Sequence, residues 1–129
     1  MKFELKVLFL TASLLCVVAH AMAADFTYKE YVKTSELWKR GYVFGISQYM
    51  STVAQPDEEA PYQVRDAYQR CFAASTEVAL VRAVEAHVAK HSASVKDHPM
   101  AVVVIRALFD LCRREIEKAR SPKAAPSRK

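Results

Sequence analysis

Glycine is nearly absent from this sequence, with only 2 among 129 residues. This scarcity excludes a glycine-rich loop of the kind that cradles phosphate groups. Strand-like alternation of polar and apolar residues is also rare, whereas alanine is frequent, and together these features favour helices. No nucleophile elbow and no metalloprotease helix motif occurs. We therefore expect an all-α protein that is not an enzyme and uses no cofactor.

The chain has only one long apolar run, and it is too short to cross a bilayer. It covers residues 7–18 and follows Lys2 and Lys6, whereas a spanning helix needs roughly 20 apolar residues. The segment at 20–24 has small residues at the positions that a signal peptidase reads, which completes the three-part pattern of a secretory signal rather than a membrane anchor. We expect cleavage near Ala23, export to the periplasm, and no membrane insertion of the mature chain.

Basic charge is concentrated at the carboxyl end. The formal net charge is +5, and residues 113–129 hold seven Lys or Arg and two Glu. Because a nucleic-acid-binding protein usually has a basic face on its folded part, we expect no nucleic-acid partner. The residues after Arg120 include no apolar residue larger than alanine and are expected to be disordered. The domain organisation is thus a signal peptide at 1–23, a single helical domain at 24–120 and a basic tail at 121–129.

Three cysteines occur, and Cys16 leaves with the signal peptide. The remaining pair, Cys71 and Cys112, is most simply a disulfide in a small exported domain. Two buried free thiols are the alternative. A bridge over this separation stabilises a fold by about 4 kcal/mol on the chain-entropy model.

The first half of the mature chain predicts one long helix and a loop. Residues 25–34 form a leading segment or a short helix. Ser35 is a suitable N-cap for a helix that reaches about Ala54. The loop at 55–61 is bracketed by prolines and carries three acids. Residues 62–70 form a short helix or an ordered connection.

The second half predicts two further helices. Ser75 or Thr76 caps the first of them, which fades at 92–94. Asp97 caps the last helix, with Pro99 at an early position where proline is tolerated. The expected fold is a compact bundle of about four helices with one disulfide.

Apolar residues at helical spacing predict the buried face of each helix. In the first long helix these residues are Trp38, Tyr42, Ile46, Tyr49, Met50 and Val53. In the next they are Leu80, Val81, Val84 and Val88. In the last they are Val102, Ile105, Leu108, Phe109, Cys112 and Ile116. We expect a shared core of Ile46, Val84, Ile105, Leu108 and Phe109.

Two features of the helices suggest more than a core. Gly41 and Gly45 are four residues apart, a spacing that suggests another backbone packed close to that face. His87 and His91 are also four apart, with His98 seven residues on, and two histidines at this spacing can share a metal ion. Because the sequence supplies no third ligand, we interpret these histidines as a solvated helix edge and assign no metal.

The order of these features resembles a known family. A signal peptide is followed by a helix containing Leu37, Gly41-Tyr42-Val43 and Gly45, then by Cys71, the segment EVALVRAVEAHVAKH and the segment ALFDLC. This order is similar to that of the Rap/Tai family of type VI secretion immunity proteins, over residues 35–112. The resemblance implies an all-helical periplasmic protein, often a homodimer. It would bind a secreted cell-wall hydrolase, a peptidoglycan-cleaving amidase effector, and block its cleft sterically.

The 56–61 loop is our candidate for the contact with such a partner. Its acidic residues Asp57, Glu58 and Glu59 suit a basic cleft rim, and Tyr49 and Tyr62 flank it as anchors. The alternative for these tyrosines is that they close a small core. The alternative function is that of an HdeA-type periplasmic acid-stress chaperone, because that class also combines a signal peptide with a small disulfide-bonded helical domain.

Overall fold

The computed structural model describes residues 26–58, 60–95 and 97–121. The expected signal peptide, its cleavage site, Glu59 and the end of the basic tail lie outside these residues.

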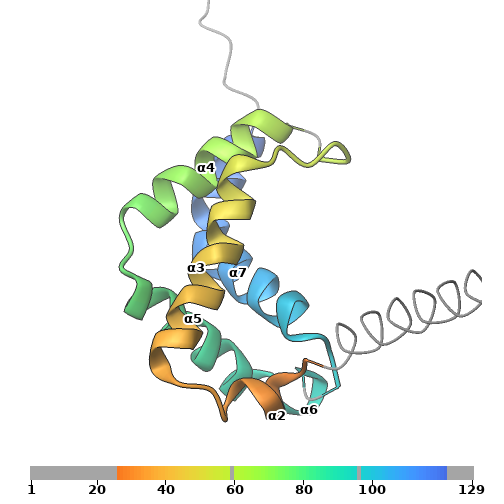
Figure 1. Ribbon diagram of the computed structural model, residues 1–129. Helices are drawn as coiled ribbons and strands as arrows, with labels where there is room; N and C mark the ends of the chain where they lie inside the picture. Colours follow the sequence, from red (N-terminus) through yellow and green to blue (C-terminus); the bar gives the residue numbers. More distant parts are fainter. Residues whose placement is uncertain (1–25, 59, 96, 122–129) are drawn as a thin grey trace, which may run out of the picture.

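Four long helices form the body of the protein, and two short helices accompany them, one before the first long helix and one before the last (Figure 1). The long helices are α3 (Glu36–Thr52), α4 (Pro61–Ala73), α5 (Glu77–Lys90) and α7 (Met100–Arg120), and the short ones are α2 (Tyr28–Tyr31) and α6 (Ser92–Val95). The part of the chain that the structure describes holds no strand, only an isolated bridge between Thr27 and Pro99. The expected all-α fold is confirmed, and the expected four helices correspond to the long ones.

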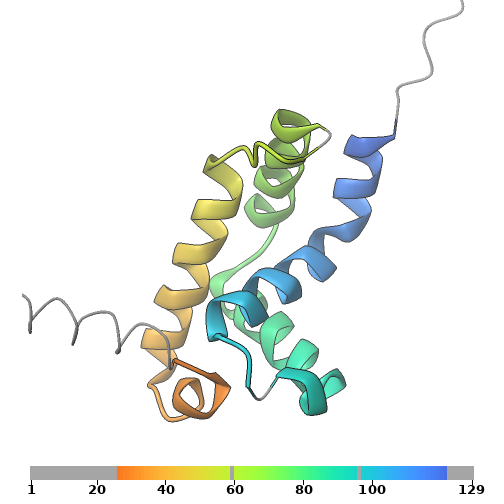
Figure 2. The same cartoon turned by 90° about the vertical axis from the view of Figure 1, so that its right-hand side faces the viewer.

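The two longest helices, α3 and α7, run the length of the molecule. Each packs against α4 near one end and against α5 near the other (Figures 1 and 2). The core therefore lies where all four long helices face inward. No helix in the described ranges combines the length and the apolarity that a bilayer crossing requires.

Local signals fix where three of these helices begin. The Ser35 hydroxyl accepts a hydrogen bond from the backbone N–H of Trp38 at 3.2 Å, so Ser35 is the N-cap of α3, as predicted. Thr76 caps α5 in the same way through the N–H of Ala79 at 3.2 Å. Helix α4 begins at Pro61, where the missing N–H of proline leaves no bond unmade.

The start of α7 differs from the expectation. The helix begins at Met100 rather than just after Asp97, and Pro99 occupies the cap position in an extended conformation. Proline disfavours helical geometry in the residue before it, which keeps His98 out of the helix and prevents Asp97 from acting as its N-cap. The leading segment supplies the missing partner, because the Met100 N–H donates to the Phe26 carbonyl at 2.8 Å.

The predicted inner face of α3 was only partly correct. Met50 is buried as predicted, and Tyr42 and Ile46 pack half-buried against the core. Trp38, Tyr49 and Val53 are exposed instead, and Val43, which was not predicted, is buried. The buried face also contains the small residues Ser47 and Ser51, whose hydroxyls donate to carbonyls within α3. Aromatic side chains dominated the sequence pattern, but rings with polar atoms tolerate a helix edge, and small inward residues let α3 approach its neighbours.

The glycine prediction was wrong as well. Gly41 and Gly45 lie on the exposed side of α3, and no other segment of the described residues comes within 4 Å of the place that a Cβ would take at either position. The close packing on α3 occurs at its serines instead.

The helix α5 stripe was predicted correctly, since Leu80, Val81, Val84 and Val88 are all buried. The stripe of α7 was correct only in its second half. Of the expected shared core, Val84 and Leu108 are buried, and Ile46 and Phe109 are half-buried against the core. The prediction for Ile105 was wrong, because this side chain is 40% exposed. Val103, Val104 and Ala107 are buried in its place.

The predicted disulfide is present. Cys71 lies in the last turns of α4 and Cys112 in the middle of α7, with their sulfurs 1.99 Å apart. Cys112 is buried in the core. The bridge therefore joins α4 to α7 from within the packed interior.

Candidate functional site

The loop between α3 and α4 is held against the end of α7. Both guanidinium arms of Arg120 donate to the Glu58 carboxylate, Nε to Oε1 at 2.9 Å and Nη2 to Oε2 at 2.6 Å. A two-point Arg–carboxylate pair fixes both distance and orientation. This pair connects residues 62 positions apart in the chain, so the tertiary structure, and not the loop sequence, positions this part of the loop.

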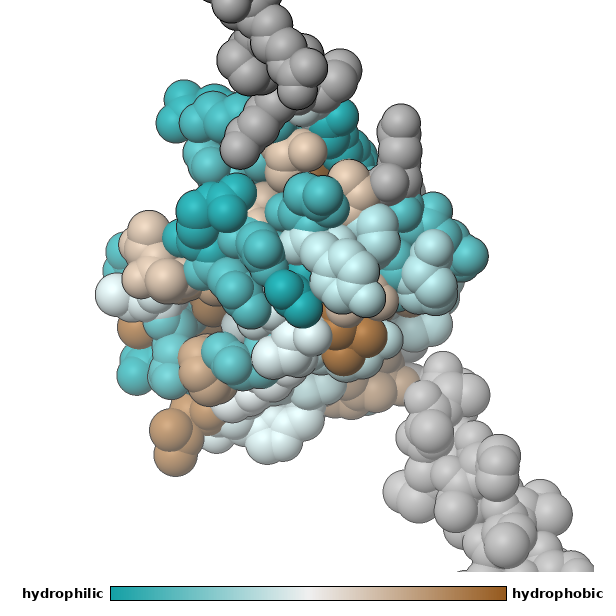
Figure 3. Space-filling view, turned by 90° about the horizontal axis from the view of Figure 1, so that it is seen from above, coloured by the Kyte–Doolittle hydropathy of each residue, from teal (hydrophilic) through white to brown (hydrophobic). Residues whose placement is uncertain are grey.

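The two tyrosines that flank the loop project into solvent. Tyr49, one turn before the end of α3, is 52% exposed, and Tyr62, at the start of α4, is 64% exposed. The guanidinium of Arg65 lies 5.4 Å from the centre of the Tyr62 ring and supports its orientation. Seen from the end that carries this loop, the surface is largely hydrophilic, with hydrophobic residues in small separate patches (Figure 3).

The predicted acidic residues of this loop differ in their roles. Asp57 is exposed, whereas Glu58 is engaged by Arg120. Glu59 lies outside the described residues. Of the five candidates, Tyr49, Asp57 and Tyr62 therefore face solvent, and Glu58 supports the loop.

The other tyrosines divide between core and surface. Tyr31 and Tyr68 are buried, and Tyr28 and Tyr42 pack against the core from its edge. Tyr42 also stacks on Trp38, with ring centres 4.9 Å apart. The core interpretation therefore holds for these four tyrosines, whereas Tyr49 and Tyr62 are exposed.

A second candidate site is an open groove of about 900 Å³ between α5 and α7. Its polar lining comes from His87, Lys90 and His91 on α5 and from Arg106, Asp110 and Arg113 on α7. Its apolar lining includes Ile105 and Leu111, which are both exposed on α7. The groove therefore combines apolar walls with several ionisable groups, as ligand sites commonly do.

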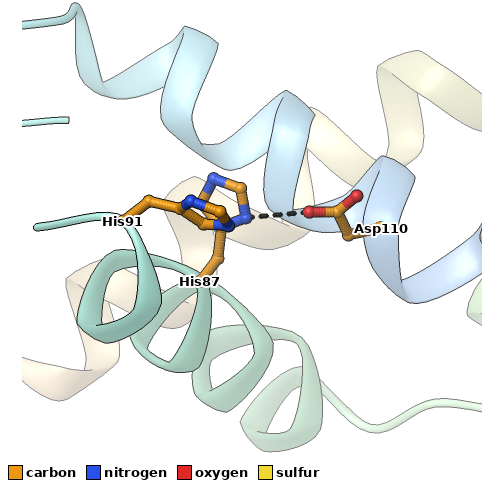
Figure 4. A group of neighbouring side chains, drawn as sticks. All are labelled: His87, His91 and Asp110. Carbon is orange, nitrogen blue, oxygen red and sulfur yellow. Dashed lines mark hydrogen bonds and ion pairs between the residues drawn. The ribbon is translucent and has the colours of Figure 1, made fainter. Parts of the chain in front are cut away.

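Three of these side chains converge on one point (Figure 4). The rings of His87 and His91 project from successive turns of α5, with centres 4.7 Å apart. Asp110 reaches them from α7, and its Oδ2 lies 3.0 Å from Nδ1 of His87. One ligand atom from each residue lies within 4.8 Å of the other two. His98 is not part of this group.

The carboxylate of Asp110 is held from both sides. Its Oδ1 accepts a hydrogen bond from Arg113 one helical turn further on, while its Oδ2 contacts His87. Burial by itself raises the pKa of Asp110, but the hydrogen bonds and charges of Arg113 and His87 outweigh it and lower that pKa. Asp110 is therefore a carboxylate at neutral pH, with a fixed orientation toward the two histidines.

Asp110 is the residue that sequence reasoning missed. The histidine pair was visible from its spacing, but the third member lies 19 residues after His91 and on another helix. Its only local signal is a charged residue within the apolar segment ALFDLC. No local pattern indicates that α7 turns this residue toward α5.

Comparison with known proteins found no matching family model, curated protein or solved structure.

Proposed function

We propose that this protein acts by binding another protein without turning over a substrate, as an immunity protein of the Rap/Tai type. Its partner would be a peptidoglycan-cleaving amidase effector of a type VI secretion system, which it would block sterically in the periplasm. The observation that carries the proposal is a loop fixed by Glu58 and Arg120 and flanked by two exposed tyrosines.

A fixed loop suits an inhibitor that fills a cleft. Binding requires the loss of conformational freedom at the interface, and a loop that is already ordered loses less of it. Pro56 and Pro61 restrict the backbone further. Tyrosine is among the residues that contribute most to binding energy, because its large ring combines apolar area with a polar tip. Tyr49 and Tyr62 would be the anchors.

The surface around the tyrosines is consistent with specific recognition. Exposed Asp57 offers a negative charge to a basic cleft rim, and the end of the molecule is otherwise polar with separate apolar patches (Figure 3). Stable interfaces of this kind combine a few buried anchors with a polar rim.

The direct test uses the mature protein and a purified amidase encoded beside its gene. We expect a complex at neutral pH, loss of peptidoglycan cleavage, and protection of cells that receive the amidase in their periplasm. Tyr62→Ala should weaken binding by about 30-fold, as for a binding hot spot. Asp57→Lys should weaken it while leaving the helical content unchanged.

One control variant makes the test specific. Leu37→Ala removes an exposed apolar side chain at the opposite end of α3 and should leave affinity unchanged. Glu58 should not be reversed in charge, because Lys at that position would also break the contact with Arg120. An effect of Leu37→Ala instead of Tyr62→Ala would move the interface to the start of α3.

The chaperone alternative predicts a different result. An HdeA-type protein would bind no amidase at neutral pH and would suppress aggregation of unrelated proteins near pH 3. The homodimer implied by the family resemblance stays a prediction, which analytical ultracentrifugation of the mature chain tests directly.

A further inference from the structure

We propose that His87, His91 and Asp110 form a zinc site that joins α5 to α7. This site lies in the groove described above and is independent of the proposed immunity function.

The helix geometry of α5 supplies two of the ligands. Residues four apart lie one above the other on a helix, so His87 and His91 present their rings to the same point, as their 4.7 Å separation indicates (Figure 4). Histidine pairs at this spacing are recurrent zinc ligands, because each imidazole offers one lone pair to the metal.

Asp110 supplies the third ligand at nearly the required distance. Two ligands that each lie about 2.0–2.1 Å from a tetrahedral zinc are about 3.3 Å apart. The His87–Asp110 separation is 3.0 Å, and no pair of ligand atoms is more than 4.8 Å apart. The widest pair of ligand atoms must approach by at most about 1.5 Å to reach this spacing, a shift within the reach of the half-buried His91 side chain.

The surroundings orient the ligands as outer-shell groups do in metal sites. Arg113 donates to Oδ1 of Asp110 and leaves Oδ2 directed at the histidines. Ligating carboxylates commonly have such a partner, which fixes their orientation. The fourth position faces the groove, where Lys90 and Arg106 also line the wall. A water molecule or a small anion completes the tetrahedron there.

The ligand set selects the class of metal. Two imidazole nitrogens and one carboxylate oxygen suit zinc and its neighbours in the transition series, whereas magnesium and calcium require mainly oxygen ligands. Binding therefore discriminates between Zn²⁺ and Mg²⁺. Because the ligands come from two helices, bound zinc stabilises the folded state over the unfolded chain.

The test uses the mature, disulfide-bonded protein without a histidine tag, titrated with ZnCl₂ in a calorimeter. We expect one Zn²⁺ per chain and no heat from MgCl₂. At free Zn²⁺ about ten times the dissociation constant, the midpoint of thermal unfolding should rise by about 5–10 °C. Co²⁺ in place of Zn²⁺ should give the visible absorption of a tetrahedral site.

Single substitutions then assign the ligands. His91→Ala is the primary variant, because its half-buried ring packs on His87 just after the end of α5 and its loss should not disturb the fold. It should weaken Zn²⁺ binding by about 100-fold or more, because changes to residues that only support metal ligands already weaken binding by about 10–100-fold. Asp110→Asn should weaken it by at least about tenfold. His98→Ala, which removes a histidine outside the group, should bind as tightly as the wild type.

Two results would overturn the proposal. One is Zn²⁺ affinity that is equal in the wild type and in His91→Ala, since binding would then occur elsewhere. The other is equal affinity in the wild type and in Asp110→Asn, because two surface histidines alone would then account for it. Circular dichroism of each variant checks that the fold is retained.

Discussion

Breaking the disulfide should remove a large share of the stability of this fold. Cys71 and Cys112 are separated by 41 residues. On the chain-entropy model, a cross-link over a loop of this length lowers the entropy of the unfolded chain enough to stabilise the fold by about 4 kcal/mol. Domains of this size have about 5–15 kcal/mol of total stability. The reduced protein should therefore still fold, but with only a small remaining free energy of unfolding.

The assay is urea unfolding followed by far-ultraviolet circular dichroism. The oxidised wild type is compared with the reduced wild type, which keeps both sulfur atoms and so isolates the cross-link from its packing. The double variant Cys71→Ala, Cys112→Ala serves as a second comparison. It should be slightly less stable than the reduced wild type, because Cys112 is buried and alanine leaves a small void. Thiol counting by mass spectrometry verifies the redox state of each sample.

Equal midpoints for the oxidised and reduced proteins would refute the reasoning. Such a result would mean that the unfolded chain keeps Cys71 and Cys112 close together without the bond, so that the cross-link removes no entropy. A difference below about 1 kcal/mol between the unfolding free energies of the oxidised and reduced proteins would lead to the same conclusion. Two free thiols in the unreduced protein would contradict the bond itself.

Three other predictions concern the core. Leu108→Ala should lower the free energy of unfolding by about 2–5 kcal/mol, because Leu108 is 0% exposed. Ile105→Ala on the same helix should lower it by only about 1–2 kcal/mol. Equal losses in urea unfolding would mean that the inner face of α7 is assigned wrongly. The Tyr31 hydroxyl is buried and has no hydrogen-bond partner among the described residues, so Tyr31→Phe should raise the free energy of unfolding by about 1 kcal/mol. A lower melting temperature for this variant would mean that the hydroxyl does have a hydrogen-bond partner. Burial raises the pKa of Tyr68 from 10.0 to about 12, so the unfolded state ionises first and stability falls as the pH rises from 10 through 12. Tyr68→Phe should reduce that fall in alkaline unfolding curves, and an unchanged curve would contradict the assignment.

The sequence by itself determined the class of fold and the starts of α3 and α5. Caps such as Ser35 and Thr76 act through hydrogen bonds to N–H groups three residues away, so they can be predicted without knowing the fold. The α5 stripe was predicted for a related reason, because its apolar residues are all branched aliphatics with no polar atom to expose. The pairing of Cys71 with Cys112 followed from there being only two cysteines after the signal.

Only the tertiary structure decided which faces turn inward on the other helices. On α3, apolar and aromatic residues surround most of the helix, so periodicity did not separate the buried Val43 from the exposed Tyr49. On α7 the run Val102 to Ile105 is apolar throughout, and packing against the other helices buried its middle rather than its ends.

The candidate sites depended on long-range contacts to an even greater degree. Tyr49, Asp57 and Tyr62 could be proposed from the loop sequence, but the fixing of that loop required Arg120 from the far end of α7. His87 and His91 could be paired from their spacing, but Asp110 joined them only through the packing of α7 on α5. Helix signals act over a few residues, whereas these groups come together only after the core has set the position of each helix.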